Sequence, residues 1–257
     1  MSKPLLAAQL YTVREFTKTI DGVAESLHKV RDIGYTAVQL SGFGPVDPRE
    51  VARIVGDLRL TVASTHEKWE RFLTDLDALI EEHRLYKCSH PAIGGIFSQD
   101  YAGSAGVERF LAELAPVAAK LAKADMDFSY HNHSHELVRH DGQTWLEMLY
   151  GRGDPKTLKA EIDTYWIQHG GGDPAWWVRR CAGREPILHL KDMTVSAKRE
   201  QRMAEIGEGN LNWPAILQAA DEGGVQYACV EQDYCYERDP FESLAISYRN
   251  LRKMGLK

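Results

Sequence analysis

Short apolar segments alternate with longer segments of helical periodicity along the whole chain. The longer segments repeat apolar side chains at intervals of three and four residues, which is the spacing of one buried helix face. The short apolar segments are typical of strands buried in a parallel sheet. We predict eight such strands, at residues 5–10, 35–40, 60–65, 88–93, 126–131, 158–163, 186–191 and 226–231.

A helix is predicted after each of these strands. The helices are expected at residues 21–33, 47–57, 69–84, 106–123, 144–150 and 174–181, from 212 onward, and at 240–254. Eight strand–helix units in 257 residues favour a single (β/α)₈ TIM-barrel domain over residues 1–257, with its active site at the C-terminal ends of the strands. A doubly wound open sheet is the alternative, but the chain has no GxGxxG motif after the first strand.

Composition narrows the class of function. The chain is 44% hydrophobic and 26% charged, with a net charge of −6 and basic residues spread along its length. This distribution argues against a nucleic-acid partner, and the apolar runs are too short for a membrane span. The four cysteines form no CxxC pair and the N-terminus resembles a strand more than an export signal. We therefore expect a cytoplasmic protein with a small-molecule substrate, and a homo-oligomer remains open.

Residues that can bind a metal stand at the ends of four successive predicted strands. They are His131, Asp163, His189 and Glu231. The C-terminal ends of parallel barrel strands meet at one mouth, so these side chains are expected to converge. Alternation along each strand places all four on the inward face under one assumption about register. Three of the strands also lead into long or polar loops, at residues 132–143, 192–211 and 232–239.

Two imidazoles and two carboxylates form a mixed nitrogen and oxygen site that suits Mn²⁺, Fe²⁺, Co²⁺ or Zn²⁺, with Mg²⁺ also open. Each residue alone has a structural explanation. Asp163 could cap the following helix, and Glu231 could pair with Lys191 or Arg202. Four polar strand ends in succession are harder to explain in this way. The sequence therefore predicts one divalent metal ion.

Five motifs carry a resemblance to a known family. They are QLYTVR (9–14), YHNHSHEL (130–137), EIDTYW (161–166), HLKDM (189–193) and GEGNLNW (207–213). The chain resembles the xylose isomerase-like TIM barrels, often called sugar phosphate isomerases/epimerases, from its first strand to its last. YHNH and HLKD are similar to the branch of inosose dehydratase-like proteins and proteins acting on 3-keto sugars.

The resemblance implies a divalent metal, commonly Mn²⁺, held after the fifth to eighth strands, at His131, Asp163, His189 and Glu231. The chain departs from the ketose 3-epimerases of this superfamily, which have glutamate at the position of His131 and histidine at the position of Trp166. This departure argues against a tagatose- or psicose-type epimerase. The carboxylate-rich two-metal arrangement of xylose isomerase is not found either.

Further residues are expected at the same mouth. His66 and His133 are candidates for hydrogen bonds to substrate hydroxyls, although His66 could equally only pack, and Trp166 for an aromatic wall against a sugar ring. Gln9 is expected in a polar floor. Lys191 could stabilise an enolate oxygen or pair with Glu231. The GEG motif (207–209) lacks the lysine and hydroxyl residues of a phosphate loop, so a turn is the expected structure.

These residues predict proton abstraction next to a carbonyl through a metal-stabilised enediolate, with Glu231 or Glu136 as the base. If the proton returns to the neighbouring carbon or to the opposite face of the same carbon, the protein is a sugar isomerase or epimerase of carbohydrate metabolism. Loss of a neighbouring oxygen gives a dehydratase or lyase on a keto sugar, keto-glycoside or inosose (a cyclitol), which is the nearest alternative. An endonuclease IV-like hydrolase would need more metal ligands and a basic groove. A non-catalytic sugar-binding or partner subunit is the alternative of another class.

Overall fold

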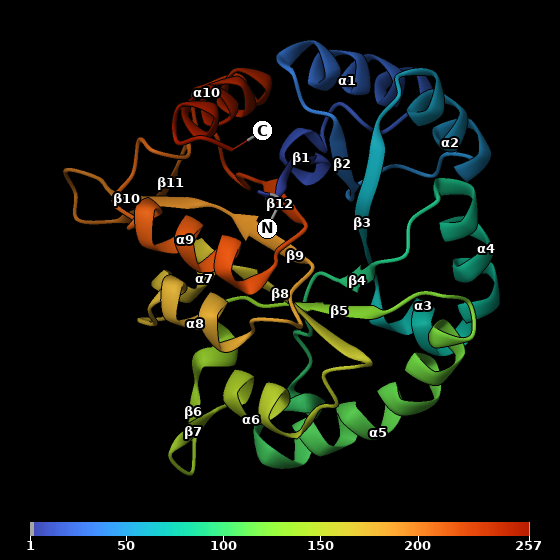
Figure 1. Ribbon diagram of the computed structural model, residues 1–257, viewed down its shortest axis with the longest axis vertical. Helices are drawn as coiled ribbons and strands as arrows, with labels where there is room; N and C mark the ends of the chain where they lie inside the picture. The colour runs from blue at the N-terminus through green and yellow to red at the C-terminus, as the bar shows by residue number, and fades with distance from the viewer. Residues whose placement is uncertain (1–2, 257) are drawn as a thin grey trace.

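Eight parallel strands close into a barrel in the computed structural model, which describes residues 3–256 (Figure 1). The order around the barrel is β1-β12-β9-β8-β5-β4-β3-β2, and each neighbouring pair is parallel. The (β/α)₈ architecture predicted from the sequence is confirmed. The strands are β1 (Leu5–Gln9), β2 (Ala37–Leu40), β3 (Thr61–Glu67), β4 (Pro91–Ile93), β5 (Phe128–His131), β8 (Leu158–Asp163), β9 (Ile187–Leu190) and β12 (Tyr227–Val230).

Helices surround this barrel (Figure 1). They are α1 (Ile20–Ile33), α2 (Pro48–Asp57), α3 (Trp69–Thr74), α4 (Leu76–Tyr86), α5 (Gly103–Ala122), α6 (Trp145–Arg152), α7 (Thr164–His169), α8 (Pro174–Arg180), α9 (Trp213–Gly223) and α10 (Pro240–Lys253). The helix predicted at 69–84 is divided, because Asp75 leaves the helical conformation with φ −141° and ψ 37°. A short helix that the sequence analysis did not predict, α7, begins directly after β8.

Several helices begin at the same kind of signal. Asp47, Asn212 and Asp239 each accept a hydrogen bond from a backbone N–H of the first helical turn, and a proline lies within that turn. The side-chain oxygen satisfies a backbone donor that has no partner in the helix, and proline supplies a helical φ where no N–H is needed. These local signals explain why the predicted starts of these three helices lie within one residue of the observed ones, whereas α5, which has no side-chain cap, begins three residues before its predicted start.

Shorter elements lie in the connections. They are the 3₁₀ turns η1 (Leu10–Val13), η2 (Gln99–Tyr101) and η3 (His135–Leu137), the antiparallel pair β6 (Arg139–His140) with β7 (Gln143–Thr144), and the antiparallel pair β10 (Asp192–Val195) with β11 (Gln201–Ala204). No helix within residues 3–256 is both long enough and apolar enough to cross a membrane.

The core has two parts. The larger part fills the space between the strands and the helices. The smaller part lies inside the barrel, where Tyr227 and Leu5 pack against a layer of buried side chains, which are Ala7, Ala37, Ala63, Ile187 and Cys229. Small side chains dominate this inner layer because several strands must fill one narrow interior. This layer closes one end of the barrel and leaves the other end for polar groups.

Asp192 folds the loop after β9 back onto the barrel. Its carboxylate accepts hydrogen bonds from the backbone N–H groups of Gly207 and Gly209, and from the indole Nε1 of Trp213 at 2.6 Å. A Cβ atom on residue 209 would lie 2.4 Å from Asp192 Oδ1, so glycine is required there. The GEG motif thus forms the turn expected from the sequence. The hydrogen bonds that Asp192 accepts from this turn and from Trp213 explain why HLKD and GEGNLNW occur together.

Candidate metal centre

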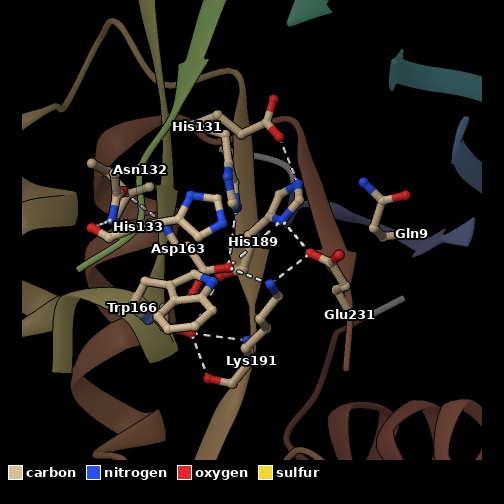
Figure 2. A network of polar contacts seen from close by, with 12 residues as sticks. Gln9, His131, Asn132, His133, Asp163, Trp166, His189, Lys191 and Glu231 are labelled. Atoms are coloured by element: carbon tan, nitrogen blue, oxygen red, sulfur yellow. Dashed lines mark hydrogen bonds and ion pairs between the residues drawn. The ribbon is translucent and has the colours of Figure 1, made fainter. Parts of the chain in front are cut away.

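His131, Asp163, His189 and Glu231 converge at the mouth of the barrel (Figure 2). His131 ends β5, Asp163 ends β8, His189 lies in β9, and Glu231 directly follows β12. All four are buried, and one donor atom from each lies within 4.8 Å of the donor atoms of the other three. The inward register expected for these four strands therefore matches the structure.

The distances between donor atoms suit ligands around one ion. His131 Nε2 lies 3.2 Å from Asp163 Oδ2, and His189 Nδ1 lies 3.0 Å from Glu231 Oε2. His189 Nδ1 is 3.8 Å from Asp163 Oδ2. Ligand bonds of roughly 2.0–2.2 Å to a single cation bring neighbouring donor atoms to separations of this size. The set of two imidazole nitrogens and two carboxylate oxygens fits a first-row divalent ion.

The ammonium group of Lys191 shows that this cluster attracts positive charge. Its Nζ atom lies 2.9 Å from Glu231, 3.2 Å from Asp163 and 3.0 Å from Asp233. Burial alone would lower the pKa of Lys191, but the three carboxylates outweigh it and raise that pKa well above its ordinary value. The predicted pairing of Lys191 with Glu231 is present, and Lys191 also lies at the site itself.

Three of the four side chains, those of Glu231, Asp163 and His131, are in the protonation state that binds a metal ion. Burial raises the pKa of Glu231 and Asp163, but Lys191 and the neighbouring imidazoles outweigh it, so both carboxyls have a lowered pKa. Burial lowers the pKa of His131 to about 4, and the neighbouring imidazole of His189 acts in the same direction. Neutral imidazole and ionised carboxylate are the forms that bind metal ions. His131 Nδ1 is buried and has no hydrogen-bond partner among the described residues.

A cleft of about 820 Å³ opens above this cluster. His66, His133 and Trp166 line it, as do Lys191 and Glu231. These predicted substrate contacts are therefore brought together at the mouth. The cleft has the size of sites that hold a small organic ligand. Its rim carries the exposed aromatic rings of Phe97, Tyr234 and Tyr11.

Asp233 is a cleft residue that the sequence analysis missed. It lies two positions after Glu231 and contacts Lys191. Burial raises the pKa of Asp233 to about 7, against the opposing effect of Lys191. Alternation beyond the end of β12 could have revealed it, since residues 231 and 233 share a parity.

Two predicted residues lie away from the cleft lining. Gln9 is fully buried inside the barrel, where its Oε1 accepts a hydrogen bond from the backbone N–H of Tyr11. Glu136 lines a separate, smaller cavity beside Ile96. Both oxygens of its carboxylate are engaged, one by the hydroxyl of Tyr130 at 2.9 Å and the other by the backbone N–H of His133 at 2.8 Å. Glu136 therefore fixes the loop that presents His133.

The fold and this cluster define a class of protein, the TIM barrels whose mouth carries side chains able to hold a metal ion. The family model described as xylose isomerase-like TIM barrel matches residues 27–253, and the chain belongs to this family. A search of curated proteins found no match.

Solved structures share the fold at low sequence identity. A sugar phosphate isomerase/epimerase from Parabacteroides distasonis ATCC 8503 is 21% identical, with a TM-score of 0.81, and the match covers 100% of this chain and 96% of that one. An L-ribulose 3-epimerase is 18% identical, with a TM-score of 0.72 and coverage of 100% and 95%. The probable 3-DHS dehydratase AsbF from Bacillus anthracis is 15% identical, with a TM-score of 0.69 and coverage of 98% and 99%.

Proposed function

We propose that the protein is a divalent-metal-dependent sugar isomerase or epimerase that removes a proton from the carbon next to a carbonyl. One observation carries the proposal. Donor atoms of four side chains that can bind a metal ion lie within 4.8 Å of one another beneath a cleft large enough for a sugar. The family supports it, and two of the similar structures are an isomerase/epimerase and an epimerase by name.

His131, Asp163, His189 and Glu231 would hold the ion, and we propose Mn²⁺ as the first candidate. When bound, such an ion would polarise a carbonyl group and favour negative charge on its oxygen. Four protein ligands leave room in a five- or six-coordinate ion for oxygens of the substrate. His133 and Trp166 line the cleft above the cluster and would contact the rest of the sugar.

Glu231 is the proposed base. It lines the cleft, is ionised through its lowered pKa, and lies 2.9 Å from Lys191 Nζ. Lys191 would stabilise the developing enolate oxygen, because its ammonium group is buried and already oriented. Return of the proton to the neighbouring carbon isomerises the sugar, and return to the opposite face epimerises it. Glu136 was the other candidate, but its engaged carboxylate and separate cavity favour Glu231.

A dehydratase or lyase is the second candidate. Elimination needs a base and also a group that can assist the departing oxygen. Asp233 supplies another carboxylate in the same cleft, and its Oδ2 atom lies 3.0 Å from Lys191 Nζ. The histidine at position 131 and the tryptophan at position 166 also depart from the pattern of ketose 3-epimerases. One similar structure is a probable dehydratase by name.

Metal analysis followed by proton exchange tests the proposal. The purified protein is expected to hold one divalent ion per chain and to catalyse deuterium incorporation from D₂O next to the carbonyl of a keto sugar or inosose. A rearranged sugar as product indicates the isomerase or epimerase, and an unsaturated product indicates the dehydratase or lyase. Protein that binds sugar, holds no metal ion and exchanges no proton would instead be a non-catalytic binding subunit.

A further inference from the structure

A second buried polar layer lies next to the metal cluster, inside the barrel. It consists of Glu161 on β8, Gln39 on β2, His66 on β3 and the far side of the His189 ring on β9. Glu161 Oε1 lies 2.6 Å from His66 Nε2 and 2.6 Å from His189 Nε2. The same oxygen accepts a hydrogen bond of 2.9 Å from Gln39 Nε2.

These contacts determine which nitrogen of His189 carries hydrogen. An ionised carboxylate can only accept, so Gln39 must direct its NH₂ group to Glu161 and its carbonyl oxygen elsewhere. That carbonyl oxygen lies 2.6 Å from His189 Nε2. Nε2 therefore keeps its hydrogen, and Nδ1, which lies 3.0 Å from Glu231 and donates to it in the metal-free protein, is the nitrogen that a metal ion would take.

The same carboxylate also orients His66. His66 donates its Nε2–H to Glu161, so Nδ1 is the acceptor nitrogen. The amide nitrogen of Gln9 lies 3.4 Å from this Nδ1, and the Gln9 oxygen is held by the backbone N–H of Tyr11. The rings of His66 and His189 are stacked, with centroids 5.1 Å apart and planes inclined by 15°.

The position of Glu161 is costly for a residue with no specific task. Its side chain is fully buried, and Oε2 has no hydrogen-bond partner among the described residues. Removing a carboxylate from water costs several kcal/mol unless charged or hydrogen-bonded neighbours compensate. All of the compensating contacts fall on Oε1, which fixes the rotation of the carboxylate and hence the position of both rings.

We infer that Glu161 is a positioning residue that, together with Gln39, holds His189 as its Nε2–H tautomer for metal ligation and holds His66 in the same tautomer at the cleft wall. The part that concerns His189 rests on the proposed metal-dependent function. The part that concerns His66 does not. Hydrogen-bond partners that orient ligating histidines commonly change metal affinity 10–100-fold when removed.

Glu161→Leu removes the acceptor, and Glu185→Leu is its matched control. Glu185 is also a buried glutamate beside the same strands, with one oxygen accepting from Ile162 N at 3.1 Å and the other unpartnered, but its hydrogen bond goes to backbone and not to a histidine. Glu161→Gln keeps an acceptor oxygen and serves as the conservative variant. Gln39→Met removes the oxygen that faces His189 and the hydrogen bond from Gln39 to Glu161, but keeps the Glu161 carboxylate.

Two measurements on the full chain test the inference. Calorimetric titration with Zn²⁺ is expected to show affinity about 10–100-fold weaker for Glu161→Leu and Gln39→Met, partly restored in Glu161→Gln, and close to wild type for Glu185→Leu. Long-range ¹H–¹⁵N spectra of the imidazoles are expected to show His66 and His189 as Nε2–H tautomers in the Zn²⁺-loaded wild type. His66 should become a tautomer mixture in Glu161→Leu.

Each other outcome has a defined meaning. Wild-type affinity and unchanged imidazole shifts in Glu161→Leu would overturn the inference. Two ions per chain, with the second shifting the His66 signals, would also overturn it, because His66, Glu161 and His189 would then be ligands of that ion. Wild-type protein that binds no ion would contradict the proposed function, and the His66 tautomer in Glu161→Leu would then decide the inference alone.

Discussion

The two ends of the barrel interior have opposite chemistry, although the same strands build both. At the closed end lie Ala7, Ala37, Ile187 and Cys229, all of them fully buried. Two residues further along each strand lie Gln9, Gln39, His189 and Glu231. A step of two residues moves about 6.6 Å along a strand and keeps the side chain on the same face. The apolar layer therefore supports the polar one directly.

This comparison separates stability from function within one core. The closed end gains free energy by packing small apolar groups. The open end places carboxylates and imidazoles where water is excluded, which costs free energy unless they pair with each other or with an ion. A change at the closed end should therefore alter folding, and a change at the open end should alter metal binding and activity.

The largest expected effect is at the open end. Glu231→Gln removes a proposed ligand and base, so proton exchange should fall by about 10³-fold or more, within the range that acid–base groups contribute to catalysis. Lys191 retains Asp163 and Asp233 as partners, so the variant should still unfold cooperatively with a native circular dichroism spectrum. Wild-type exchange in this variant would remove Glu231 from the mechanism.

The corresponding change at the closed end is Ile187→Ala. It deletes a fully buried side chain from the inner apolar layer, so the free energy of unfolding should fall by about 2–5 kcal/mol. Metal affinity of the folded protein should change little. Urea denaturation measures the first quantity and calorimetry the second.

Phe97→Ala is the control for Ile187→Ala, because this ring is 67% exposed at the rim. Its effect on the free energy of unfolding should stay within about 0.5 kcal/mol. A large loss of metal affinity in Ile187→Ala, without loss of stability, would contradict the division between the two ends.

Apart from the control variant, the smallest predicted loss of stability comes from comparing a buried histidine outside the barrel wall with one inside the barrel. On the outer side of β3, Thr65 Oγ1 lies 2.8 Å from His83 Nε2, and burial lowers the pKa of His83 to about 4. Inside the barrel, burial also opposes the charge of His189, but Glu161 and Glu231 raise the pKa of His189 to about 10. Burial keeps His83 uncharged, whereas carboxylates keep the metal-free His189 ring charged until an ion displaces the proton from Nδ1.

The folded pKa of His83 lies below its unfolded value of about 6.5, so the unfolded chain binds the proton more readily. The stability from His83 is present above pH 6.5 and is lost as the pH falls toward 4. Between pH 7 and 4.5, wild type should lose about 2 kcal/mol more than His83→Gln. Equal losses in urea titrations at the two pH values would show that His83 titrates normally in the folded protein.

The sequence determined the barrel and the four residues of the candidate metal cluster because both depend on local periodicity. Alternation along β5, β8, β9 and β12 assigns each side chain to the inside or the outside, and the end of each strand assigns it to the mouth. Residue type then indicates the chemistry. No tertiary information is needed for these steps, apart from the assumption that the strands are parallel and close into a barrel.

Tertiary structure decided what depends on irregular backbone or on pairing between distant residues. The register shifts between β2 and β3 at Val38/Gln39, so Ala63 and His66 both face inward although they are three positions apart, and strict alternation would have turned His66 outward. Tertiary structure also decided which distant residues pair. Examples are the hydrogen bond from Tyr130 to Glu136, the contact of Asp233 with Lys191, and the hydrogen bonds of Glu161 to groups on β2, β3 and β9. A hydrogen bond depends on distances of a few tenths of an ångström between residues far apart in sequence, and a pattern of residue types along one chain does not contain those distances.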